Sequence, residues 1–105
     1  MIVSFEKQYL RDLYEKGKTD DKRYRYQPEI MRKYRRCIDI LFDASGIEAL
    51  YRINSLNYEI LRGDKQGLSS IRVNKQYRIE FRVTDNGAEH VATVCNILEL
   101  SNHYK

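Results

Sequence analysis

The sequence has no tryptophan, one proline and two cysteines in 105 residues, and it lacks any long apolar run. None of its apolar stretches approaches the roughly 20 residues that a membrane-spanning helix needs. The first ten residues, MIVSFEKQYL, lack the basic start and long apolar core of a secretory signal peptide. These absences predict a cytoplasmic protein that does not associate with a membrane.

The two cysteines have positions typical of core residues. Cys37 falls on the apolar face of a predicted helix and Cys95 in a predicted strand, so we expect buried free thiols and no disulfide. No Cys/His cluster has the spacing of a zinc site. No glycine-rich loop has a nucleotide-binding pattern. The sequence therefore predicts neither a metal ion nor a small-molecule cofactor.

What the sequence has in abundance is charge, and the charge is unevenly placed. The length predicts a single domain over residues 1–105. Six basic and two acidic residues lie between Arg62 and Arg82, an excess of +4 that equals the net charge of the whole chain. The basic residues of this segment are Arg62, Lys65, Arg72, Lys75, Arg78 and Arg82. A basic stripe of this kind indicates a phosphate-rich partner.

The first half of the chain has helical periodicity after a short opening strand at Ile2–Phe5. Apolar residues recur at helical spacing between Phe5 and Tyr14, and Gly17 suits the end of that helix. Pro28 suits the first turn of a second amphipathic helix, which reaches residue 42. Ser45 and Glu48 have the spacing of a capping box, which predicts a short third helix over 46–51.

From Asn57 the apolar period changes to two. This pattern predicts strands at 58–62, 68–74, 77–84 and 89–98, with a hairpin turn at 85–87. The last strand is apolar on both faces, which predicts a central position. Helices followed by strands predict an α+β fold, in which two N-terminal helices pack on a largely antiparallel four- to five-stranded sheet. The face away from the helices would carry Arg72, Arg78 and Arg82.

The segment from Gly63 to Phe81 reads G-D-x-x-G-x-x-S-I-R-V-N-x-Q-Y-R-I-x-F. This pattern resembles the HigB-like branch of the RelE superfamily of bacterial toxins, and the resemblance covers nearly the whole chain. It implies a RelE-like fold and ribosome-dependent cleavage of mRNA. It also implies neutralisation by a cognate, HigA-like antitoxin. The chain departs from the family at Ser69, where tryptophan is frequent, and at Asn102-His103, where many members end Asp-Tyr-His.

RNA can be cut without a metal ion when its own 2′-hydroxyl attacks the adjacent phosphate. Cations must then stabilise the phosphorane, and other groups must move protons. Together with the resemblance, this chemistry makes Arg72 and Arg78 candidate catalytic residues that grip the phosphate. His103 is the candidate proton-transfer group, because the pKa of histidine lies near neutrality. The candidate substrate-binding residues are Arg62, Lys65, Asn74 and Tyr104.

Other interpretations remain open from the sequence. A toxin of the same fold can lack nuclease activity and inhibit DNA gyrase, and a third possibility is an RNA-binding module without catalysis. His90, beside the predicted hairpin turn, is expected on the surface. The basic run 32–36 is either the solvated face of its helix or a contact for ribosomal RNA.

Overall fold

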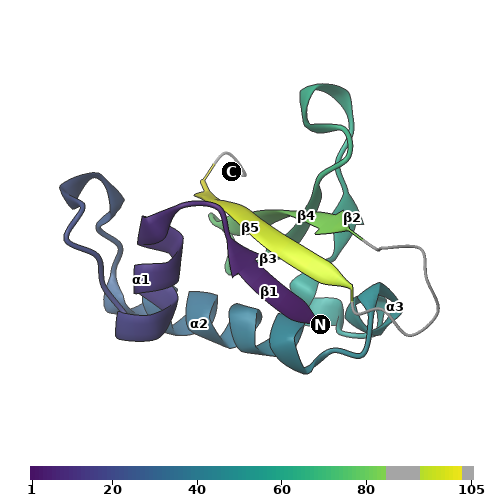
Figure 1. Ribbon diagram of the computed structural model, residues 1–105, viewed down its shortest axis with the longest axis horizontal. Coiled ribbons are helices and arrows are strands. Elements are labelled where there is room, and N and C mark those ends of the chain that lie inside the picture. The colour runs from purple at the N-terminus through teal and green to yellow at the C-terminus, as the bar shows by residue number, and fades with distance from the viewer. Residues whose placement is uncertain (85–92, 103–105) are drawn as a thin grey trace.

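The computed structural model describes residues 1–84 and 93–102, and helices cover one face of a sheet in this part of the chain (Figure 1). In chain order the elements are β1 (Ile2–Phe5), α1 (Gln8–Lys16), the 3₁₀ turn η1 (Lys22–Tyr24), α2 (Pro28–Asp43), α3 (Ile47–Tyr51), η2 (Asn54–Leu56), β2 (Glu59–Ile60), η3 (Gly63–Lys65), β3 (Ser69–Arg72), β4 (Arg78–Thr84) and β5 (Val94–Ser101). None of the described helices is long and apolar enough to span a membrane.

The five strands form one sheet in the order β1-β5-β4-β3-β2. The first strand pairs parallel to β5, and every other neighbouring pair is antiparallel. The α+β class and the largely antiparallel sheet are therefore confirmed. So is the central position of the last strand, because β5 lies between β1 and β4 and its Cys95 and Ile97 are fully buried.

The two long helices begin and end where their local sequence dictates. Helix α1 ends at Gly17, whose φ of 74° is left-handed and whose N–H donates to the carbonyl oxygen of Leu13. Glycine suits this position because a side chain would strain that backbone conformation. Pro28 is the first residue of α2, where its missing N–H costs no helical hydrogen bond. One stripe of α2 is buried against the sheet: Met31, Tyr34, Cys37, Ile38 and Leu41.

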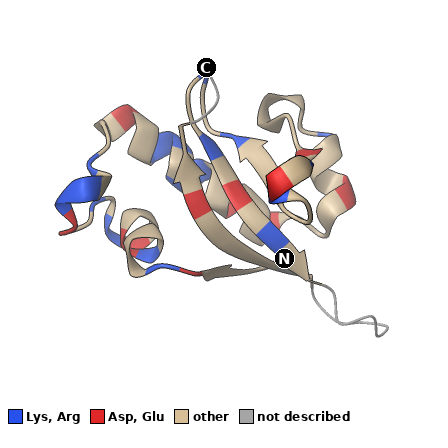
Figure 2. Ribbon diagram, turned by 90° about the horizontal axis from the view of Figure 1, so that it is seen from above, with Lys and Arg blue, Asp and Glu red and all other residues tan. Residues whose placement is uncertain are grey.

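Alternation along β4 separates the core from the opposite face of the sheet. Ile79 and Phe81 are fully buried in the core shared with the helices. The residues between and beside them, Arg78, Glu80 and Arg82, point to the other face, since successive strand residues alternate. We call this the open face because it lies away from α1 and α2, although its Arg78 and Glu80 are themselves buried. Figure 2, which looks down on the sheet from the side opposite α2, shows basic and acidic positions following one another along the central strands.

Several boundaries differ from the sequence prediction. The strand expected at 58–62 has only two residues, Glu59–Ile60, because the chain leaves the sheet as the loop 61–68. The capping box was wrong: Gly46 is the N-cap of α3, and no side-chain hydrogen bond caps that helix. The last strand extends to Ser101, three residues beyond its predicted end. The predicted hairpin turn at 85–87 and the start of the strand expected at 89 lie outside the described residues.

Candidate phosphate-binding site on the open face

Arg78 is the most firmly held cation of the open face. It is only 5% exposed, and its Nε donates to the hydroxyl of Ser70 at 2.9 Å. Its Nη2 donates to the carbonyl oxygens of Asn57 and Ser70. Asn57 has a φ of 44°, an uncommon conformation outside glycine. Residues far apart in the sequence therefore hold one guanidinium group in a defined orientation.

A carboxylate also faces this guanidinium group. Glu59 Oε1 lies 3.6 Å from Arg78 Nη2, and the Glu59 side chain is 47% exposed. An ion pair this open to water contributes little to stability. A phosphate oxygen could take the place of this carboxylate, because both are anions that accept from guanidinium N–H groups.

Arg72 and Arg78 are Cα partners across the β3–β4 pair, so both lie on one face of the sheet. Their side chains nevertheless have different partners. Arg72 is exposed, and its Nε donates to the carbonyl oxygen of Asn74 at 3.1 Å. It also lines a small groove at the junction of α2, η2 and β3, together with Lys33 and Arg36 of α2. The two arginines thus lie side by side at one end of β3 and β4, with Arg78 buried and Arg72 open to solvent.

Lys65 reaches back from η3 to the centre of the sheet. Its Nζ lies 2.6 Å from Glu80 Oε2. The Glu80 side chain is 2% exposed and that of Lys65 is 37% exposed. Sequence reasoning missed Glu80, although it is the one acidic residue among the predicted strand positions of the basic segment. The structure makes it the anchor of a candidate substrate-binding lysine.

The other predicted site residues are Asn74, Arg62, His103 and Tyr104, and the structure describes only the first two. Asn74 forms the β3–β4 turn, since its Oδ1 accepts from the N–H groups of Gln76 and Tyr77 at 2.8 and 2.7 Å. Arg62 is exposed at the start of the loop 61–68. His103 and Tyr104 lie outside the described residues, as does His90. Ser101, however, is described, and it is the Cα partner of Arg78 at the end of β5.

The cysteines and the acidic groups offer no metal chemistry in the parts of the chain that the structure describes. No group of three or more His, Cys, Asp or Glu residues is placed to hold a metal ion within 1–84 and 93–102. Cys37 and Cys95 are free thiols buried in the core, as predicted. Burial raises the pKa of each thiol to about 11, so both are protonated at neutral pH.

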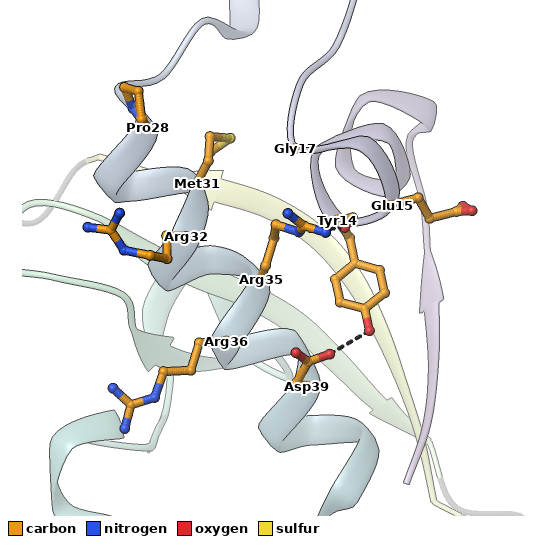
Figure 3. Close-up of a pocket in the computed structure, with 9 residues that line it drawn as sticks. All are labelled: Tyr14, Glu15, Gly17, Pro28, Met31, Arg32, Arg35, Arg36 and Asp39. Atoms are coloured by element: carbon orange, nitrogen blue, oxygen red, sulfur yellow. Dashed lines mark hydrogen bonds between the residues drawn. The ribbon is translucent and has the colours of Figure 1, made fainter.

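A second groove lies on the helical side of the molecule, between α1 and α2 (Figure 3). Arg35 Nε donates to the carbonyl oxygen of Tyr14 at 2.9 Å, and the Tyr14 hydroxyl donates to Asp39. That donation raises the pKa of Tyr14. Arg32 and Arg36 also line this groove, so part of the basic run forms an exposed helix face as predicted. This groove is on the opposite side of the sheet from Arg78.

Comparison with known protein families gives a match over most of the chain. Residues 3–94 match the family model HigB-like toxin, described as the RelE-like toxin of type II toxin–antitoxin system HigB. The chain belongs to this family of HigB-like toxins. It is 41% identical over 90 residues to Toxin HigB-1 of Vibrio cholerae serotype O1, an alignment that covers 84% of this chain and 90% of that protein.

Solved structures of related toxins share the fold at low sequence identity. A YoeB/ParE toxin from Agrobacterium tumefaciens is 20% identical, with 99% of this chain and 100% of that chain covered and a TM-score of 0.56. A mutant of YafQ from E. coli is 16% identical, with 96% and 91% covered and a TM-score of 0.59. A YoeB–YefM complex from Staphylococcus aureus is 19% identical, with 99% and 98% covered and a TM-score of 0.55. These similarities confirm the RelE-like fold.

Proposed function

We propose that this toxin is a ribosome-dependent mRNA endonuclease that cleaves by attack of the RNA 2′-hydroxyl on the adjacent phosphate. The observation that carries the proposal is Arg78, a buried guanidinium group oriented by Ser70 and Asn57 on the open face. An arginine fixed in this way can donate to a phosphate oxygen in place of the Glu59 carboxylate and stabilise the charge that develops on it. This reaction needs no metal ion, because guanidinium groups supply the positive charge.

The remaining tasks are divided among residues near Arg78. Arg72, directly opposite on β3, supplies a second cation to the phosphate. The 2′-hydroxyl loses its proton to water as it attacks, and His103 gives a proton to the leaving 5′ oxygen, as the ordinary pKa of histidine, near neutrality, allows. This assignment is supported by the end of β5, where Ser101, two residues before His103 in the sequence, is the Cα partner of Arg78.

The partners follow from the same proposal. The ribosome presents the mRNA. The exposed cations of segment 62–82 attract ribosomal RNA and mRNA before specific contacts form. A cognate, HigA-like antitoxin neutralises the toxin, as expected of a type II system. The protein would act in the cytoplasm, where translating ribosomes are found.

The test is brief expression of the toxin followed by primer-extension mapping of mRNA ends. Wild type should produce new ends within translated codons, and Arg72→Ala and His103→Ala should each abolish them. Arg11→Ala is the matched control, because it removes an exposed arginine of α1 that pairs with Glu15. This control should cleave like wild type.

Each alternative function predicts a different result when the toxin is expressed and its effects on DNA, mRNA and RNA binding are measured. DNA damage without new mRNA ends would indicate a gyrase inhibitor, and retention of RNA without any cleavage would indicate a binding module. Wild-type toxin that leaves mRNA intact on translating ribosomes would overturn the proposal. Undiminished cleavage by His103→Ala would overturn the role of that residue alone.

A further inference from the structure

The two side chains of the Lys65–Glu80 ion pair differ strongly in their exposure to solvent. The carboxylate is almost completely buried, at 2% exposure, whereas the lysine side chain is 37% exposed. One N–H of the ammonium group points to Glu80 Oε2 at 2.6 Å. An ammonium group has three N–H donors, and its exposed side can meet a ligand from solvent. We propose that Glu80 is a positioning residue, which holds the Lys65 ammonium group on the open face for contact with an RNA phosphate.

The loop that carries Lys65 shows why such an anchor is needed. The loop 61–68 is closed at its base, where the N–H of Leu61 donates to the carbonyl oxygen of Leu68 at 2.9 Å. Gly63 and Gly67 have φ values of 69° and 90°, which only glycine adopts without strain. The lysine stem is long and has several rotatable bonds, so its ammonium group samples many positions when nothing holds it. Glu80 belongs to the rigid central sheet and gives the group one position.

The Lys65 ammonium group, held at Glu80, lies on the same face of β4 as Arg78. Glu80 and Arg78 are two residues apart on β4, so their side chains project from the same face roughly 7 Å apart along the strand. The anchored ammonium group and the anchored guanidinium group therefore face a common ligand from neighbouring points of the sheet. An RNA chain that places one phosphate on Arg78 extends past Lys65. The ligand class is a phosphodiester, and the inference rests on the proposed endonuclease activity.

The experiment measures cleavage of a defined mRNA on purified ribosomes that are stalled at one codon. Two quantities are determined separately: the turnover rate at saturation, and the ribosome concentration that gives half of that rate. Rates are expressed per folded molecule, from thermal unfolding of each variant. Glu80→Gln keeps the size of the side chain and removes its charge. We expect turnover to fall roughly 10- to 100-fold, the scale of loss when a reacting group is misplaced by about 1 Å. Glu80→Asp should recover part of the turnover, because the carboxylate is retained.

Two further variants separate positioning from a purely structural role. Glu99→Gln is the matched control, since Glu99 is the cross-strand partner of Glu80 on β5 and its removal changes the charge by the same amount. It should retain wild-type turnover. Lys65→Met should lower turnover by itself, and Glu80→Gln added to Lys65→Met should lower it no further, because Glu80 acts through Lys65.

The outcomes distinguish this inference from the function on which it rests. Losses that add in the Lys65→Met/Glu80→Gln double variant would show that Glu80 acts independently of Lys65, and would overturn the inference. Wild-type turnover in folded Glu80→Gln would overturn it too, while the endonuclease activity would stand. Absence of cleavage by the wild-type toxin would overturn the proposed function itself.

Discussion

The hydroxyl of Ser70 should contribute more to stability than that of its neighbour Ser69, although both serines are buried on the same strand. Ser70 Oγ accepts from the charged Arg78 Nε at 2.9 Å. Ser69 Oγ shares a hydrogen bond of the same length with the neutral hydroxyl of Tyr58. Replacing either serine by alanine removes one oxygen and leaves the backbone unchanged. The pair thus compares a charge-assisted hydrogen bond with a neutral one.

A hydrogen bond to a charged group contributes about 1.5–3 kcal/mol, against about 0.5–1.5 kcal/mol for a neutral one. Ser70→Ala should therefore lower the free energy of unfolding by about 1.5–3 kcal/mol, and Ser69→Ala by less. At roughly 4 °C per kcal/mol for a domain of this size, Ser70→Ala should lower Tm by about 6–12 °C. Urea titration followed by circular dichroism measures the free energy, and a thermal scan measures Tm.

The comparison can refute the account of Arg78 given above. Equal losses in the two variants would mean that the Ser70–Arg78 contact has no charge-assisted character in solution. A smaller loss in Ser70→Ala than in Ser69→Ala would mean that the carbonyl oxygens of Asn57 and Ser70 hold Arg78 without help from the Ser70 hydroxyl. Ser70→Ala should also lower mRNA cleavage per folded molecule, whereas Ser69→Ala, on the helical face, should not.

Three other perturbations have defined outcomes. Glu59→Gln should change the free energy of unfolding by less than about 1 kcal/mol, because the Glu59 side chain is half exposed and its Oε1 lies 3.6 Å from Arg78. It should also tighten binding to mRNA-programmed ribosomes, and weaker binding would contradict phosphate replacement of that carboxylate. Cys37 and Cys95 should react with a thiol reagent at neutral pH only after unfolding, and rapid labelling of the folded toxin would refute this. The free energy of unfolding should fall as pH rises from about 9 to about 11, because thiols of the unfolded chain ionise while the buried ones keep their protons. Gly17→Ala should cost about 1–2 kcal/mol in urea unfolding, because φ is 74° there, and an unchanged midpoint would argue against the left-handed helix end.

Local patterns in the sequence were sufficient for most of the fold. Pro28 and Gly17 mark helix ends because each acts through its own backbone, which needs no knowledge of distant residues. The period of two over 68–84 likewise predicted that Arg72 and Arg78 share one face of the sheet, and the structure makes them direct partners in β3 and β4. The capping box failed because Gly46, which follows Ser45 directly, takes the N-cap position of α3.

The candidate site was less predictable because its contacts join distant parts of the chain. The guanidinium group of Arg78 is bound by the carbonyl oxygen of Asn57, which lies 21 residues earlier. Glu80 is bound by Lys65, which lies 15 residues earlier. Neither contact leaves a periodic signal, since periodicity reports which face a residue occupies and not which partner it meets. A lone glutamate within a basic strand was the available sign, because a buried carboxylate requires a cation nearby.

The cations of the basic segment therefore divide into two groups with different physical roles. Arg78 and Lys65 already have carboxylate partners, so their charges are largely compensated at long range and act only on a ligand that makes contact. The other four, Arg62, Arg72, Lys75 and Arg82, are exposed, so their charges extend into solvent over a Debye length of about 8 Å at physiological salt. In the proposed function, attraction of RNA, which salt weakens, is the role of the exposed group. Orientation of the phosphate, which depends on fixed geometry more than on net charge, is the proposed role of the two cations that have carboxylate partners.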